Sequence, residues 1–174
     1  MVWEMIQSIV ADATTDSLET DAFTGMDYTT LQITVYIPSG AAHHGYLYFN
    51  SDSGANYARS GSSNYAARFE TAPDNEINLT HATDTTKYAH LIFNNNQDEI
   101  KCGIGEYTDR GTAGAEKLCI GDYNYTTPSA SDSPNSRQIA GKWTGTDQIT
   151  NIEVINNGGG SFDVGSTVKI FGFT

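Results

Sequence analysis

The chain has 174 residues, a length that suits one domain and allows roughly two thirds of the unfolded surface to be buried. Seventeen glycines and ten tyrosines favour a turn-rich β protein over a helical bundle. Nine basic and 21 acidic residues give a net charge of −12, which argues against binding to nucleic acid or to anionic membranes. No apolar run reaches the roughly eighteen residues of a membrane-spanning helix, and residues 1–7 lack the basic region of a signal peptide. We therefore expect a protein that is made in a cytoplasm and has no membrane segment.

The first segment, Val2–Val10, fits two structures. Its apolar residues match helical spacing, but they also match an opening strand with a bulge. We favour the strand, because an isolated helix of about two turns would be marginal. The polar segment Ala11–Thr20 is expected to connect it to a corner at Phe23–Tyr28.

The clearest strand is Leu31–Ile37. Its aliphatic residues alternate with polar ones, so Leu31, Ile33, Val35 and Ile37 are expected to point inward. Tyr36 is then expected to point outward. Pro38 ends the strand because it has no donor for the ladder.

Shorter strands and two long loops are expected in the middle of the chain. A strand at Gly45–Asn50 precedes a loop at Ser51–Ser63, and a second loop is expected at Asn124–Arg137. The further strand candidates are Tyr65–Thr71, Glu76–Ala82, Tyr88–Asn94, Glu99–Tyr107 and Glu116–Tyr123.

Two apolar runs at the end of the chain, Ile149–Ile155 and Ser166–Phe173, predict a closing β-hairpin. The Asn-Asn-Gly-Gly-Gly sequence between them tolerates the positive φ angles of a tight reversal. The whole pattern predicts an all-β domain over residues 1–174, with about nine to ten strands. We expect an antiparallel two-sheet β-sandwich of jelly-roll-like type.

The two cysteines lie in consecutive predicted strands. Cys102 shares a face with Ile100 and Ile104, whereas Cys119 lies opposite to the face of Leu118 and Ile120. If both apolar faces point into the core, the sulfur atoms point apart, so we expect free thiols.

A weak calcium-loop pattern occupies the start of the first long loop. Asn50, Asp52 and Asn56 carry oxygen atoms at even spacing around Gly54, but no bidentate glutamate follows at the required distance. The other interpretation is an Asx-rich turn whose side chains cap their own backbone.

Other metal and catalytic patterns are absent from the sequence. His43 and His44 are adjacent and would face opposite ways on a strand, and His81 and His90 lack further zinc ligands. No nucleophile elbow, phosphate-binding loop or zinc-protease motif occurs. We expect no enzyme activity, no resident metal and no cofactor.

Aromatic residues are the main candidates for a binding surface. Tyr46 and Tyr48 share one face of their predicted strand, and such rings stack on sugars or anchor protein interfaces. The candidate interface or ligand-binding residues are Tyr36, Tyr46, Tyr48, Tyr57, Tyr123 and Trp143.

Three stretches resemble short virion proteins of tailed phages. Leu47–Tyr57 resembles their strand followed by Asn-x-Asp-x-Gly-x-Asn-Tyr, with Ser51 where glycine is usual. Trp143 with Ile149–Val154 resembles their penultimate strand. Phe162–Phe173 resembles their closing Phe-x-x-Gly-Ser-x-x-x-Leu-Tyr-Gly strand, with Ile-Phe-Gly in place of Leu-Tyr-Gly.

This resemblance implies a β-sandwich structural component of the virion, synthesised in the host cytoplasm. Within it we favour a capsid decoration (cement) protein, which would bind the major capsid protein or other virion proteins as a homo-oligomer, typically a trimer. A tail or head-fibre protein that binds a receptor, such as a host-surface glycan, is the alternative.

Overall fold

The computed structural model describes residues 2–23, 30–38, 45–63, 67–69, 77–78, 86–94, 117–126, 135–145, 147–156 and 161–173. In these residues it contains β-strands and no helix, and therefore no helix that would reach across a membrane. The strands are β1 (Trp3–Val10), β2 (Ser17–Glu19), β3 (Thr30–Ile37), β4 (Gly45–Phe49), β5 (Tyr57–Ser63), β6 (Ala67–Phe69), β7 (Ile77–Asn78), β8 (Thr86–Asn94), β9 (Lys117–Thr126), β10 (Asn135–Trp143), β11 (Ile152–Asn156) and β12 (Thr167–Phe173).

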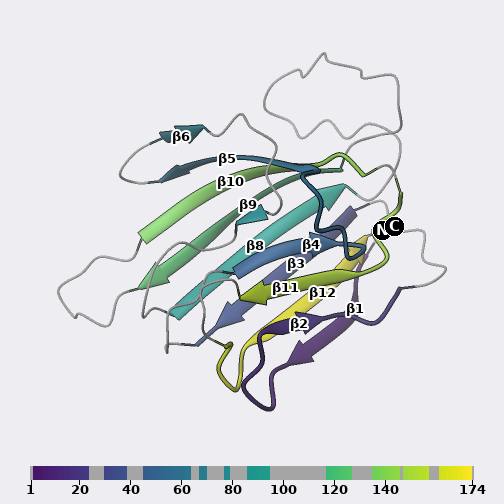
Figure 1. Ribbon diagram of the computed structural model, residues 1–174, viewed down its shortest axis with the longest axis vertical. Coiled ribbons are helices and arrows are strands. Elements are labelled where there is room, and N and C mark those ends of the chain that lie inside the picture. Colours follow the sequence, from purple (N-terminus) through teal and green to yellow (C-terminus); the bar gives the residue numbers. More distant parts are fainter. Residues whose placement is uncertain are drawn as a thin grey trace.

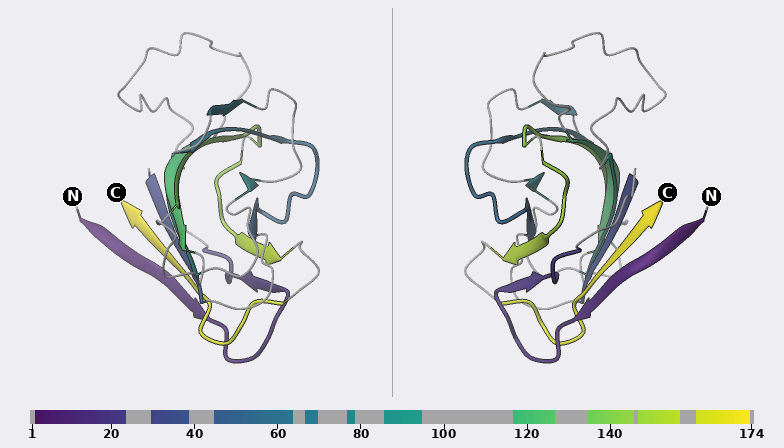
Figure 2. Two further views of the ribbon diagram at one scale, coloured as in Figure 1. Left: turned by 90° about the vertical axis from the view of Figure 1, so that its left-hand side faces the viewer. Right: turned by 90° about the vertical axis from the view of Figure 1, so that its right-hand side faces the viewer.

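These strands form two antiparallel sheets. The larger has the order β1-β12-β3-β8-β9-β10-β5-β6, and the smaller has the order β2-β11-β4-β7 (Figure 1). In the side views, the larger sheet is a curved wall with β11 and β2 on its concave side (Figure 2). The all-β, antiparallel prediction is confirmed, and the arrangement is β-sandwich-like.

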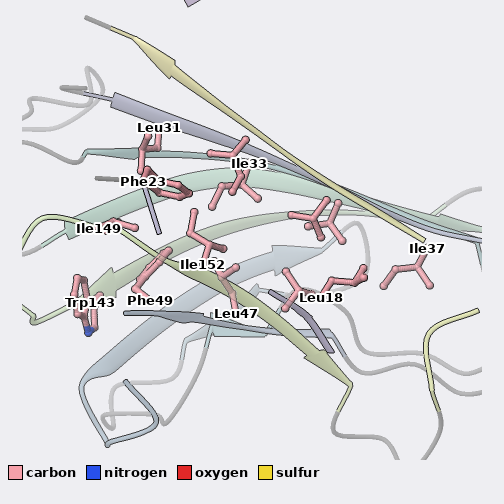
Figure 3. Close-up of a cluster of buried hydrophobic side chains, with 14 of the residues drawn as sticks. Leu18, Phe23, Leu31, Ile33, Ile37, Leu47, Phe49, Trp143, Ile149 and Ile152 are labelled. Carbon is pink, nitrogen blue, oxygen red and sulfur yellow. The ribbon is translucent and has the colours of Figure 1, made fainter. Parts of the chain in front are cut away.

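The core lies between the two sheets. β3 contributes Leu31, Ile33, Val35 and Ile37, all at most 2% exposed, as the alternation predicted. The smaller sheet faces them with aliphatic and aromatic side chains from β4 and β11 (Figure 3). Burial of these side chains is the main stabilising term of such a fold.

The first segment is a strand with a bulge, as we favoured. β1 pairs with β12, and the register shifts between Met5 and Gln7. The polar connection that follows contains one strand that was not predicted, β2, in which only Leu18 is buried. So short a strand has no period that a sequence pattern can reveal.

The predicted closing hairpin is wrong. β11 pairs with β2 and β4 in the smaller sheet, whereas β12 pairs with β1 and β3 in the larger one. Alternating apolar residues identify the buried face of a strand but not its neighbour, so two strands that face each other across the core look like a hairpin. The connection also contains Phe162, which is buried and bridges to Thr15.

The predicted loop at Ser51–Ser63 is wrong in its second half. Residues 57–63 form β5, which pairs with β10 from Tyr57 opposite Trp143 to Ser63 opposite Arg137. β10 itself overlaps the end of the second predicted loop. β5 has no large apolar residue after Tyr57, so its ladder, and not its hydrophobic pattern, defines it as a strand.

The remaining strands were placed correctly in part. The candidates at Tyr65–Thr71 and Glu76–Ala82 contain the short strands β6 and β7. The candidates at Tyr88–Asn94 and Glu116–Tyr123 correspond to β8 and β9. The described residues hold twelve strands, more than the nine to ten expected. Cys102 and the candidate strand Glu99–Tyr107 lie outside the described residues, and so does the Gly158–Gly160 turn.

Candidate functional site

The stretch with the calcium-loop pattern is a tight turn. The Asp52 amide donates to the Phe49 carbonyl at 2.8 Å, and the two residues between them have positive φ angles, 50° at Asn50 and 56° at Ser51. Two central residues in this region define the mirror-image turn that glycine and asparagine favour. Ser51 is therefore held in a conformation that costs a non-glycine residue free energy.

The Asp52 carboxylate is the centre of this turn. It accepts hydrogen bonds from Trp143 Nε1 at 2.7 Å, from the Gly54 amide at 3.0 Å and from Asn56 Nδ2 at 3.0 Å. Burial raises the pKa of Asp52, but the bonds from Trp143, Gly54 and Asn56 outweigh burial and hold the pKa below its ordinary value. The carboxylate is thus stabilised in its charged form.

Asn50 ties the turn to the segment before β11. Its Oδ1 accepts from the amides of Thr150 at 2.8 Å and Asn151 at 3.1 Å, and its Nδ2 donates to the Gln148 carbonyl at 2.9 Å. Asn50 and Asp52 therefore bind different protein donors, and Asn56 turns a nitrogen toward Asp52. These contacts are those of the Asx-rich turn. In the part of the chain that is described, no group of three or more His, Cys, Asp or Glu side chains is placed to hold a metal.

Two of the six aromatic candidates lie in the core beside this turn. Tyr57 is 0% and Trp143 3% exposed, and their rings stack with centroids 6.5 Å apart. Phe49 completes the group at 5.5 Å from Trp143 (Figure 3). The Tyr57 hydroxyl donates to the Asp52 carbonyl at 2.8 Å and accepts from the Phe49 amide at 3.0 Å. Burial raises the pKa of Tyr57 well above its ordinary value. An exposed platform that includes Trp143 or Tyr57 is therefore not formed.

Tyr46 and Tyr48 do share a face, as predicted, and it is the outer face of the smaller sheet. They alternate with the buried Leu47 and Phe49, and both are half-buried. Tyr48 lies opposite Glu153 in β11, and Glu153 lies opposite Glu19 in β2. Burial, and next the nearby Glu19 carboxylate, raises the pKa of Glu153. We call this surface, which consists of Tyr46, Tyr48, Glu19 and Glu153, the Tyr–Glu face.

Of the remaining candidates, only Tyr36 has a side chain that the structure describes, and it lies apart from the Tyr–Glu face. Tyr36 is exposed on β3, on the outer face of the larger sheet. Tyr123 and His90 lie in β9 and β8, and the structure describes only their backbone. His43, His44 and His81 lie outside the described residues.

The sequence reasoning missed an apolar surface at the edge of the larger sheet. Val2, Trp3 and Met5 are exposed, and the Trp3 ring contacts the Phe173 ring with centroids 5.3 Å apart. Phe171 is the register partner of Met5 on the same face. The sequence signal was present as tryptophan and methionine in a terminal strand, but only the sheet order shows that this strand is an edge.

Comparison of the chain with known protein families, with curated protein sequences and with solved structures gives no match.

Proposed function

We propose that this chain is a jelly-roll structural protein of a tailed-phage particle, and in particular a decoration (cement) protein of the capsid. In this proposal it binds the major capsid protein at the outer capsid surface as a homo-oligomer and stabilises the shell. The resemblance implies a trimer. The protein acts by contact and catalyses no reaction.

The observation that carries the proposal is the pairing order of eight strands. β1 pairs with β12, β2 with β11, β3 with β8 and β4 with β7, all antiparallel. A jelly roll has eight strands in two sheets with nested pairs of this kind, and it is frequent in viral capsid and lectin domains, so this pairing order supports the proposal. The pairs β5–β6 and β9–β10 then extend the larger sheet beyond β8.

The distribution of side chains also supports a binding role. The polar groups of the Asp52 turn bond to one another and to the backbone, so they serve the fold. Large apolar side chains are exposed on β1 and at Tyr36 and Ile120, all on strands of the larger sheet. A contiguous exposed apolar patch, such as the one on β1, is one mark of a protein–protein contact.

Thermal melting of empty shells tests the proposal. Mature shells that lack this protein are mixed with the purified chain, and we expect it to co-sediment with them and to raise their melting temperature. Unchanged melting together with no co-sedimentation would contradict capsid binding. The same protein denatured before mixing is the control for non-specific effects.

The Tyr–Glu face supports one alternative, a tail or head-fibre protein that binds a glycan. Tyrosine rings stack on sugars while carboxylates accept hydrogen bonds from hydroxyl groups. The two acids would disfavour anionic sugars. A glycan array with the purified chain separates this alternative from capsid decoration, because only a receptor-binding protein is expected to retain neutral or amine-bearing glycans.

A further inference from the structure

Strand β1 is an exposed edge strand of the larger sheet. It ends the larger sheet and pairs only with β12 among the described strands (Figure 1). Natural edge strands are usually blunted by short length, proline, charged side chains or a β-bulge. Of these devices β1 has one charged residue and one bulge. β1 has eight residues, of which Glu4 is the only charged one, and Met5 and Val10 are each 57% exposed.

The bulge gives β1 a symmetric pattern of faces. Before the bulge, Trp3 and Met5 pair with Phe173 and Phe171 on the outer face of the sheet. After it, Ser8 and Val10 pair with Lys169 and Thr167, which lie on that same face because Val168 and Ile170 are buried in the core. Positions 3, 5, 8 and 10 therefore point outward. Reversing the strand about the midpoint between Ile6 and Gln7 exchanges position 3 with 10 and position 5 with 8, so outward positions replace outward positions.

Symmetry of this kind is what a two-fold contact needs. In an antiparallel pair, directly opposed residues lie on the same face. A regular eight-residue strand fails this condition at full overlap, because reversal exchanges its outward and inward positions. With the bulge, full overlap places Trp3 opposite Val10 of the second copy, and Met5 opposite Ser8. We propose that β1 pairs in this register with β1 of a second copy of this chain, so that the two larger sheets become continuous.

The charge distribution favours a second copy over a basic partner. The outward residues of β1 and their partners on β12 include Lys169 and no acidic residue. The two Glu4 side chains would be five residues apart along the strand, about 17 Å, which exceeds the screening length of about 8 Å at physiological salt. On the outward face of the sheet, two chains of net charge −12 can thus meet without opposed acids.

This contact goes beyond the proposed function. An isologous two-fold contact closes as a dimer, so it names a different assembly from the trimer that the resemblance implies. Failure of the dimer would leave the shell-binding test unaffected.

Molar mass in solution, measured by light scattering across the micromolar range, tests the contact. We expect two chains for the wild type, one chain for Met5→Lys, and two chains for Ile120→Lys. Ile120 is a matched control, because it is 46% exposed on the outer face of the same sheet and β12, β3 and β8 separate its strand from β1. A wild-type mass of one or three chains, or a Met5→Lys variant that remains a dimer, would overturn the proposal.

Disulfide trapping tests the register. In a Cys102→Ser, Cys119→Ser background, the pair Met5→Cys and Ser8→Cys is expected to form a covalent dimer under mild oxidation. The pair Met5→Cys and Val10→Cys, whose positions are not opposed, is expected to remain monomeric on a denaturing gel. Equal cross-linking of both pairs, or of neither, would contradict the register.

Discussion

The indole Nε1 of Trp143 donates a 2.7 Å hydrogen bond to Oδ2 of Asp52, a residue 91 positions earlier in the chain. This bond joins the end of β10 to the turn between β4 and β5, and so links the larger sheet to the smaller one. Because the indole is almost fully buried, it has no alternative partner in water. The turn that contains Asp52 is thus part of the packing between the sheets.

Replacement of Asp52 by alanine is expected to destabilise the protein. The change leaves the buried Trp143 N–H without an acceptor and removes the bonds from Gly54 and Asn56. Loss of such charge-assisted bonds costs about 2 kcal/mol of unfolding free energy, which urea denaturation measures. Asp12→Ala, at an exposed position, is the control and is expected to change stability by less than about 0.5 kcal/mol. Equal effects of the two substitutions would contradict the role of the turn.

Ser51→Gly is expected to stabilise the protein by up to about 1 kcal/mol. Ser51 has a φ of 56°, which glycine adopts without the steric cost that serine has. Ser53→Gly is the matched control, because Ser53 is outside the positive-φ region and the change only adds freedom to the unfolded chain. We expect the thermal midpoint to rise for Ser51→Gly and to stay or fall for Ser53→Gly. The opposite order would show that the turn has another geometry.

Glu153→Gln is expected to stabilise the protein at neutral pH. The folded-state pKa of Glu153 is raised above its ordinary value of 4.5, so its ionisation costs folding free energy at pH values above both the unfolded and the folded pKa. Below the unfolded pKa both states are protonated, and the advantage of the variant is expected to vanish. Unfolding measured from pH 7 to pH 3.5 checks this dependence, with Asp12→Asn as the control. A gain that is independent of pH would contradict the electrostatic cause.

The sequence predicted best where large side chains alternate. Leu31–Ile37 has an aliphatic residue at every second position, so its strand and buried face followed directly. β5 has Tyr57 as its only large apolar residue, and it is a strand because β10 lies beside it. The same limit explains the wrong hairpin, since β11 and β12 each show their buried face but not their neighbours.

The candidate site was predictable to a similar extent. A period of two placed Tyr46 and Tyr48 on one face, and the sheet confirms it. It could not show that Trp143 and Tyr57 are covered by the opposite sheet, because that burial depends on residues about 90 positions apart. The hydrophobic pattern also could not locate the bulge within β1, because apolar residues lie on both sides of it.

Tyr46→Ala is expected to have no effect on shell binding if the protein decorates capsids. If instead the Tyr–Glu face binds glycans, the same change would remove one stacking ring and lower glycan affinity about tenfold, as measured by calorimetry. Tyr36→Ala, on the outer face of the other sheet, is the control and should leave glycan binding unchanged.

Electron cryomicroscopy of intact particles tests the central claim most directly. If the chain is a decoration protein, β-sandwich density of this size is expected at regular positions on the outer capsid surface, and it is expected to be missing from particles made without the gene. Density for the chain only at the tail or fibre, or no density on the particle, would contradict capsid decoration.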